Sequence, residues 1–170
     1  MAEDAPAAYP ERAAAEPRPS AAVYVARTFA APRERVFRAW TDPEAVRRWF
    51  GSSLGPATSA ESDLRVGGGY RITVRIPPTG RRAHAIGEFL EVDPPRRLVY
   101  TFAWERMPIL ALGMGDSKVT VEFVEIAGGT EVRLTHELLD RRRLRAFHRW
   151  GWNASLGRLA RLLADQPTRP

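Results

Sequence analysis

The chain has 170 residues, of which 44% are hydrophobic and 27% charged, and this balance suits one globular domain with its own core. The absence of cysteine excludes disulfide scaffolds, thiolate nucleophiles and cysteine-ligated metals, and it fits a reducing, cytoplasmic setting. No apolar stretch approaches the roughly 20 residues that a membrane span needs. The net charge of +6 comes from a large excess of arginine, which we attribute to composition bias, so we do not expect nucleic acid as a partner.

The composition changes near both ends of the chain. Residues 1–20 contain four prolines and seven alanines but few large apolar side chains, so they cannot offset the entropy lost on ordering. We expect a disordered tail at 1–20, a folded domain at 21–165 and a frayed end at 166–170. The acidic, proline-rich start also lacks the basic and apolar regions of a secretory signal.

The folded part begins with an alternating strand at 23–29, followed by two helices. Pro32 suits the start of the first helix, which carries an apolar stripe. Asp42 is a good N-cap for a second, short helix with Pro43 at its first position, and Gly51 ends that helix.

A period of two then predicts strands, with turns between them. We expect strands at 63–66, 70–76, 83–92, 97–104, 117–126 and 131–139. Gly87 indicates a bulge or a bend within the third of these. In the last strand, the alternation points four side chains inward, namely Val132, Leu134, His136 and Leu138.

The chain closes with a long amphipathic helix at about 141–164, with Asp140 as its expected N-cap. Its inward stripe includes His148, Gly151, Trp152 and Ser155. Successive hairpins make the sheet mainly antiparallel, and this helix is the long element able to cover one face. The arginine-rich run at 141–145 has no structural role that we can assign, which keeps an acidic protein partner as an alternative.

Five segments in this order resemble a known family. They are WTDPE at 40–44 with WF at 49–50, GEFLEVDPPRRL at 87–98, VTVEF at 119–123, LTHE at 134–137 and GW at 151–152. This run resembles the activator of heat-shock protein 90 ATPase homologue-like family of the START-like, or SRPBCC, superfamily. The likeness covers about residues 22–164.

The resemblance implies an α+β helix-grip fold. A curved antiparallel sheet of six to seven strands would wrap around the long C-terminal helix, with two short helices after the first strand and a cavity between sheet and helix. Superfamily members bind lipids, sterols and other apolar molecules, and some are cyclases, aromatases or hydrolases. The eukaryotic namesake stimulates a chaperone ATPase and carries a separate N-terminal domain. Here only the 20-residue tail precedes the fold, which counts against that role.

Small residues on the inward helix face, Gly151 and Ser155, would leave room for a cavity with aromatic walls. The alternative is that Gly151 only allows close packing of the helix on the sheet. The residues expected to line the cavity are Trp49, Tyr100, Phe102, Trp104, Met107, Met114, His136, His148, Trp152 and Ser155.

Two inward histidines are the candidates for chemistry. As a pair, His136 and His148 would orient a ligand carbonyl or carboxylate, or serve as acid and base. In an enzyme, His136 would alternatively work with a nearby acid such as Glu88. The alternative is that each histidine is a hydrogen-bonded core residue. A bulge at Gly87 would change the face on which Glu88 lies. We expect no metal and no cofactor, because two histidines alone do not make a metal site.

The predicted loop at 106–115 is unusually apolar, with Met107, Ile109, Leu110, Leu112 and Met114. It fits a lid over the cavity, a contact between two copies in a homodimer, a membrane-touching loop or a short buried helix.

Three functions remain open at this point. The first is a binding protein for a small hydrophobic or amphipathic molecule. The second is a cyclase-like or hydrolase-like enzyme that uses the same cavity, and the third is a chaperone-associated, protein-binding module.

Overall fold

The computed structural model describes residues 21–51, 56–107, 117–139 and 141–165. The predicted tail at 1–20, the frayed end at 166–170, most of the apolar loop with Met114, and the expected cap Asp140 lie outside the described residues.

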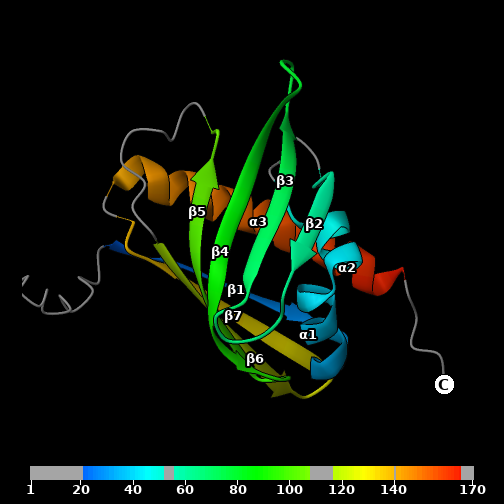
Figure 1. Ribbon diagram of the computed structural model, residues 1–170. Coiled ribbons are helices and arrows are strands. Elements are labelled where there is room, and N and C mark those ends of the chain that lie inside the picture. The colour runs from blue at the N-terminus through cyan, green and yellow to red at the C-terminus, as the bar shows by residue number, and fades with distance from the viewer. Residues whose placement is uncertain (1–20, 52–55, 108–116, 140, 166–170) are drawn as a thin grey trace, which may run out of the picture.

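Seven strands form one antiparallel sheet in the order β1-β7-β6-β5-β4-β3-β2 (Figure 1). The strands are β1 (Val23–Phe29), β2 (Ser59–Ser62), β3 (Gly69–Ile76), β4 (Arg81–Asp93), β5 (Arg97–Glu105), β6 (Ser117–Ile126) and β7 (Gly129–Glu137). The helices are α1 (Arg33–Thr41), α2 (Pro43–Trp49) and α3 (Arg142–Ala164).

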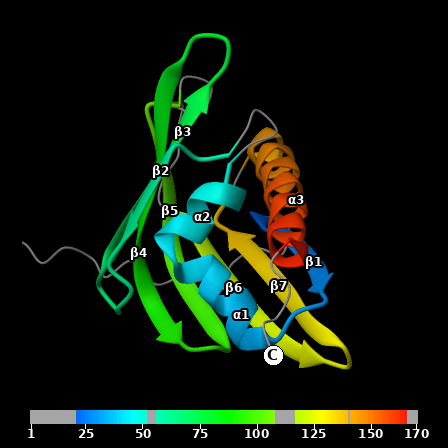
Figure 2. The same cartoon turned by 90° about the vertical axis from the view of Figure 1, so that its right-hand side faces the viewer.

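The sheet curves around α3, with α1 and α2 lying between β2–β5 on one side and α3 on the other (Figure 2). Packing contacts join α3 mainly to β1 and α2. The expected helix-grip architecture is therefore confirmed. Within the described ranges, none of the helices combines the length and apolarity needed to cross a bilayer.

The short helices begin as their sequence predicts. Asp42 caps α2, because its Oδ1 accepts a hydrogen bond from the backbone nitrogen of Glu44 at 3.0 Å. Pro43 occupies the first helical position, where its missing N–H costs nothing. By contrast, α3 follows Arg141, whose side chain makes no capping bond, and its first turn has no acidic residue.

Three expectations about the strands are wrong. The predicted strand at 63–66 is a turn instead, and the strand that pairs with β3 is β2. Here Gly67 has a positive φ of 79°, and a Cβ atom at Gly68 would overlap the carbonyl oxygen of Asp63. The glycines therefore reverse the chain earlier than the alternation of side chains suggested.

The bulge in β4 lies between Phe89 and Glu91, not at Gly87. Gly87 pairs in register with Tyr70, and a Cβ there would lie 2.7 Å from Tyr70 Cε1 and would overlap the Thr101 carbonyl. The glycine is thus required mainly by the carbonyl of Thr101, and also by the ring of Tyr70, rather than by a change of register.

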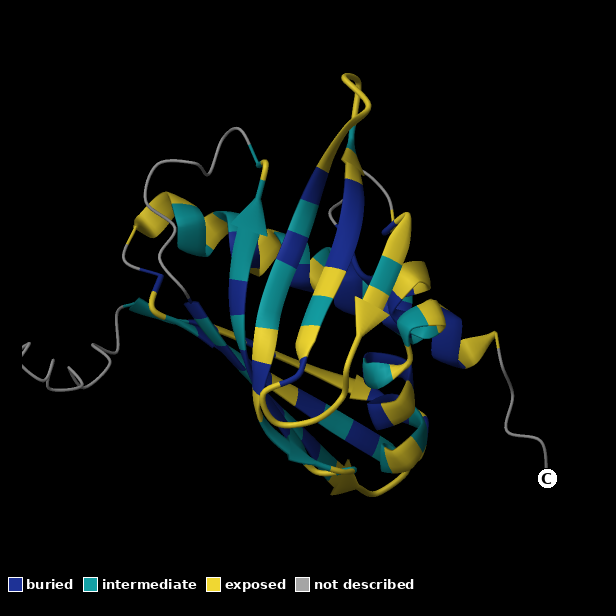
Figure 3. Cartoon of the chain, viewed as in Figure 1, coloured by how far each residue is buried: buried dark blue, intermediate teal, exposed yellow. Residues whose placement is uncertain are grey.

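Leu138 does not follow the inward side chains of β7. It has a positive φ of 64° and is 51% exposed, whereas Leu139 is buried and donates its N–H to the carbonyl of Ala21 at 2.9 Å. The strand ends at Glu137, so the period of two ends there too. Within β6 and β7, buried positions alternate with less buried ones, as expected (Figure 3).

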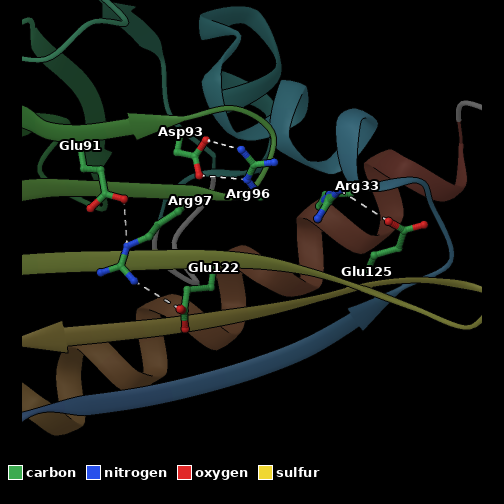
Figure 4. A network of polar contacts seen from close by, with 7 residues as sticks. All are labelled: Arg33, Glu91, Asp93, Arg96, Arg97, Glu122 and Glu125. Carbon is green, nitrogen blue, oxygen red and sulfur yellow. Dashed lines mark hydrogen bonds and ion pairs between the residues drawn. The ribbon is translucent and has the colours of Figure 1, made fainter.

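Ion pairs link the β4–β5 hairpin with β6, and α1 with β6 (Figure 4). Arg97 lies between Glu91 at 3.2 Å and Glu122 at 3.4 Å, and Arg96 contacts Asp93 at 3.1 Å. Arg33 lies 3.6 Å from Glu125. Such exposed pairs contribute little to stability, but they neutralise part of the arginine charge locally.

Candidate functional site

An aromatic cluster occupies the centre of the space between the sheet and the helices. Trp40 of α1 lies 4.7 Å from Trp49 of α2, and its ring stacks on Trp152 of α3 at 6.3 Å with an interplanar angle of 18°. Phe50, which follows α2, meets Trp152 edge-on at 6.0 Å. Indole rings therefore fill much of the region where one large cavity was expected.

His136 is fully buried beside this cluster and belongs to a chain of hydrogen bonds. The indole Nε1 of Trp152 donates to His136 Nδ1 at 3.1 Å. Because an indole N–H can only donate, Nδ1 is the unprotonated nitrogen and Nε2 carries the hydrogen. That hydrogen points to Ser117 Oγ at 2.8 Å, and Ser117 donates in turn to the carbonyl of Phe102 at 2.6 Å.

Both ring nitrogens of His136 are therefore occupied. Burial, and to a smaller extent the neighbouring His148, holds the pKa of His136 well below its usual range, so the ring stays neutral. Glu88 is exposed on the opposite face of β4, so the structure does not bring it together with His136. The arrangement of these two residues supports a packing role for His136.

His148 lies beside His136, with 4.6 Å between the ring centroids, but its hydrogen bonding differs. Its Nδ1 donates to the carbonyl of Leu144 at 2.9 Å, which leaves Nε2 as an acceptor in the neutral ring. That Nε2 is buried and has no hydrogen-bond partner among the residues that the structure describes. Burial lowers the pKa of His148, although the bond to Leu144 partly opposes this.

Trp104 of β5 presents a second polar atom of this kind. Its Nε1 is buried and lacks a hydrogen-bond partner in the described part of the chain. The Trp104 ring meets Phe102 edge-on at 5.6 Å. Phe102 also lies 5.8 Å from His148, so both polar rings flank the same phenylalanine.

Two pockets lie beside the aromatic cluster. The larger of the two, here called the α2 pocket, opens between α2 and the β2–β3 side of the sheet. About 510 Å³ there is free of protein atoms, a volume that includes open solvent at the mouth of the pocket. Its lining residues are Trp40, Thr41, Pro43, Val46, Trp49, Phe50, Ala60, Glu61, Ser62, Tyr70, Ile72, Phe89, Tyr100 and Phe102.

The tyrosines of the α2 pocket are neutral wall residues. Tyr70 donates its hydroxyl hydrogen to the carbonyl of Thr101 at 2.8 Å. Burial raises the pKa of Tyr70 and of Tyr100 well above the usual range, so neither ionises near neutral pH. The inner wall is therefore uncharged and mainly aromatic.

A smaller pocket, here called the α3 pocket, lies between α3 and β5. It encloses about 340 Å³ including its mouth. Its lining residues are Phe50, Gly51, Phe102, Trp104, Phe147, His148, Gly151, Trp152 and Ser155. Phe50 and Phe102 border both pockets and so separate them.

The end of α2 is fastened to α3 by side chains of the long helix. Arg158 donates from Nε to the carbonyl of Trp49 at 2.9 Å and from Nη2 to that of Gly51 at 2.6 Å. Ser155 also donates to the Gly51 carbonyl, at 2.7 Å. These bonds fix the position of Phe50 between the pockets.

The residues expected around one cavity are thus divided between several places. Trp49 and Tyr100 line the α2 pocket, whereas Trp104, His148, Trp152 and Ser155 line the α3 pocket, and Phe102 lines both. His136 lines neither pocket, Met107 packs against the core, and Met114 lies outside the described residues.

Sequence reasoning missed Phe50 and Val46 as pocket residues. Both residues belong to the predicted second helix, and the sequence held no signal for the space beside them. It also missed the contribution of Phe147, which is only partly buried.

A comparison with known protein families and structures is consistent with this geometry. The family model described as activator of Hsp90 ATPase homolog 1-like protein matches residues 30–164. No curated protein matches the chain significantly.

Several solved structures share the fold. A protein from Rhizobium leguminosarum is 28% identical, with a TM-score of 0.71, over 86% of this chain and 95% of that one. A protein from Chromobacterium violaceum is 26% identical, with a TM-score of 0.70, over 85% and 97%. An AHSA1-like protein from Aeromonas hydrophila, 23% identical, has a TM-score of 0.70 over 88% and 98% and supports the fold alone.

Proposed function

The chain belongs to the family of activator of Hsp90 ATPase homolog 1-like proteins, and we propose that it binds a small hydrophobic or amphipathic molecule in the α2 pocket. The observation that carries the proposal is the pocket itself, which has aromatic and aliphatic inner walls and one open side. Ligand pockets in proteins typically combine such apolar walls with a few polar groups.

The polar groups of the α2 pocket favour an amphipathic ligand. Glu61 and Ser62 of β2 are exposed, whereas Ile72 and Phe89 are buried. An apolar body would therefore lie against the inner wall, and a polar end would remain near β2 in contact with water. Burial of the apolar body supplies the main driving force, at about 25 cal/mol per Å².

The walls of the α2 pocket are held in place before any ligand arrives. Trp49 donates its indole hydrogen to the carbonyl of Ala39 at 2.7 Å, which fixes the ring between α1 and α2. Arg158 holds the end of α2 as described above. A preformed pocket loses less conformational entropy on binding, which favours affinity.

The geometry favours binding over catalysis. The titratable residues that line the two pockets are Glu61, Tyr70, Tyr100 and His148. Glu61 is exposed at the rim of the α2 pocket, and the two tyrosines remain protonated. His148 lines only the α3 pocket, so neither pocket brings an acid and a base together.

The test compares the wild-type protein with variants in which a larger side chain fills the α2 pocket. It measures the binding of N-phenyl-1-naphthylamine, an apolar dye whose fluorescence rises on burial. We expect saturable binding to the wild-type protein and at least about tenfold weaker binding to Ala60→Trp, because Ala60 is the partly buried residue of β2 that lines the pocket and the new indole would occupy it. Val46→Phe fills the pocket from α2 and serves as a second variant.

The matched control is Val66→Trp, which adds the same indole at a position that is 63% exposed and outside the pocket. Circular dichroism verifies that each variant is folded. No saturable binding to the wild-type protein, or equal binding by both folded pocket variants, would contradict the proposal.

A further inference from the structure

Positive charge is distributed unevenly between the two ends of the molecule. The tip of the β3–β4 hairpin and the start of α3 lie at one end, whereas α1 and the β4–β5 and β6–β7 turns lie at the other (Figure 1, Figure 2). At that other end, acidic side chains pair with Arg33, Arg96 and Arg97 (Figure 4). The first end therefore holds the arginines that need an explanation.

The exposed arginines of this first end, here called the arginine end, come from two separate elements. None of them forms an ion pair with another residue of the described ranges. They are Arg75, Arg81 and Arg82 of the hairpin, the arginines at 141–143, and Arg149 of α3.

Two arginines of the hairpin stand directly opposite each other. Arg75 of β3 pairs in register with Arg82 of β4, and the next pair is Ile76 with Arg81. Like charges in directly opposite positions of an antiparallel pair destabilise it. The hairpin also extends beyond the rest of the sheet (Figure 1). A negatively charged partner at its tip would remove this repulsion.

The start of α3 carries positive charge where a helix least tolerates it. Arg141, Arg142 and Arg143 are exposed at the N-terminal end, where the helix dipole is itself positive. The first turn has no acidic residue and no capping side chain, and the 23 residues of α3 include neither aspartate nor glutamate. Here too, a negatively charged partner would stabilise an arrangement that the fold alone does not favour.

An exposed aromatic pair accompanies these charges. Trp150 of α3 is 47% exposed, and its ring lies 6.4 Å from that of Phe147. Their spacing from Arg143, four and seven residues, places all three on one side of the helix. Tryptophan is enriched at the boundary between lipid and water, because its ring is apolar and its N–H is polar.

From this combination we propose that the arginine end docks on the surface of a membrane that contains anionic lipids. A lipid surface is broad enough to meet the hairpin and α3 together, and basic and aromatic side chains on a helix suit its head-group region. The inference goes beyond the function proposed for the α2 pocket, since none of these arginines lines that pocket.

Sedimentation with lipid vesicles tests the proposal. Vesicles of phosphatidylcholine mixed with phosphatidylglycerol are compared with vesicles of phosphatidylcholine alone. At low salt we expect binding at least about tenfold stronger to the anionic vesicles, and most of it should be lost at about 0.5 M salt, which screens the charges. Equal binding to both kinds of vesicle, or none to the anionic ones, would overturn the proposal.

Two double variants locate the docking surface. Arg75→Gln with Arg82→Gln removes the opposed pair of the hairpin, and Arg142→Gln with Arg143→Gln removes charge from the start of α3. Each should weaken binding to anionic vesicles by about tenfold. Because each relieves an unfavourable placement of charge, the melting temperature should not fall. A lower melting temperature in both variants would contradict the proposal, since it would show that these arginines stabilise the fold.

The matched control is Arg38→Gln with Arg96→Gln, which causes the same loss of charge at the opposite end of the molecule. Both residues are exposed, Arg38 on α1 and Arg96 in the β4–β5 turn. This variant should bind anionic vesicles within about twofold of the wild-type protein. A loss equal to that of the other double variants would overturn the proposal, because only the total charge would then matter.

Tryptophan fluorescence reports which side of the protein meets the lipid. Phosphatidylglycerol with brominated acyl chains quenches nearby indoles, so it should quench the wild-type protein, and Trp150→Phe should lose most of this effect. Unchanged quenching in folded Trp150→Phe would contradict the proposal. Binding to duplex DNA that is tighter than binding to the anionic vesicles at the same salt concentration would also overturn it, because the arginines would then serve nucleic acid.

Discussion

The two inward histidines occupy neighbouring parts of the core with opposite properties. Around His136, each ring nitrogen has a partner, and the residue is closed in by Trp152 and Ser117. Around His148, one nitrogen is bonded, whereas the other is buried without a hydrogen-bond partner in the described part of the chain. Burial is similar at both sites, so burial alone does not distinguish a structural histidine from one available to a ligand. The two histidines differ instead in whether each ring nitrogen has a hydrogen-bond partner.

Replacement of each histidine by leucine should separate the two regions most strongly. His136→Leu leaves the indole hydrogen of Trp152 without its acceptor and the oxygen of Ser117 without the hydrogen that it accepts, although Ser117 still donates to Phe102. We therefore expect a loss of about 3–5 kcal/mol in the free energy of unfolding. His148→Leu gives up one bond to a carbonyl and removes an unpartnered acceptor, so we expect a loss of about 1 kcal/mol or less. Urea denaturation measures both values.

Equal losses in the free energy of unfolding for the two variants would show that the hydrogen bonds of His136 do not stabilise the fold more than those of His148. The slope of the unfolding free energy against urea should stay the same in both variants. If it changes, the unfolded state has been altered as well.

The dependence of stability on pH gives the next largest effect. Burial lowers the pKa of both histidines in the folded protein below the value of 6.5 that is usual for the free side chain. Below about pH 6.5 the unfolded chain therefore binds protons that the native protein does not, and the free energy of unfolding decreases as the pH falls. The slope is at most about 1.4 kcal/mol per pH unit for each histidine.

Urea denaturation between pH 7.5 and 5.5 measures this slope, and His148→Leu should reduce it by the share of one histidine. An unchanged slope in that variant would mean that His148 takes up a proton equally well in the folded and unfolded states. His136 would then be the main source of the pH dependence.

The smallest effect concerns the room beside α3. A Cβ atom at Gly151 would meet nothing within 4 Å, and glycine is unfavourable inside a helix. Gly151→Ala should therefore raise the free energy of unfolding by about 0.5–1 kcal/mol. The expectation that Gly151 only allows close packing is thus not supported by its surroundings.

Gly87→Ala is the contrasting variant, because its Cβ would meet the carbonyl of Thr101 and the ring of Tyr70. It should lower the melting temperature, whereas Gly151→Ala should raise it. Thermal unfolding followed by circular dichroism measures both. A lower melting temperature for Gly151→Ala would show that the space at this position is needed.

Local patterns predicted much of the fold, because they depend on neighbouring residues. Alternation along β7 placed His136 inward, and helical spacing placed His148 and Ser155 on the buried face of α3. Asp42 and Pro43 marked the start of α2 through capping geometry. The pattern failed where backbone angles change, as at Leu138 with its positive φ.

The site was harder to predict, because its shape depends on contacts between distant segments. The fastening of α2 to α3 by Arg158 joins residues more than 100 positions apart, and it has no local signature. The position of Phe50 between the two pockets also has no local signature in the sequence. The hydrogen bond from Trp152 to His136, which occupies one nitrogen of the candidate base, also follows only from tertiary structure.

The hydrogen bonds from Arg158 to the carbonyls of Trp49 and Gly51 affect how the binding preference of such a protein can change in evolution. Phe50 stands between the two held carbonyls and forms part of both compartments. A single substitution of Arg158, which lines neither pocket, would shift Phe50 and change the shape of both pockets at once. Selection for a different ligand can therefore act on Arg158, which contacts no ligand in either pocket itself.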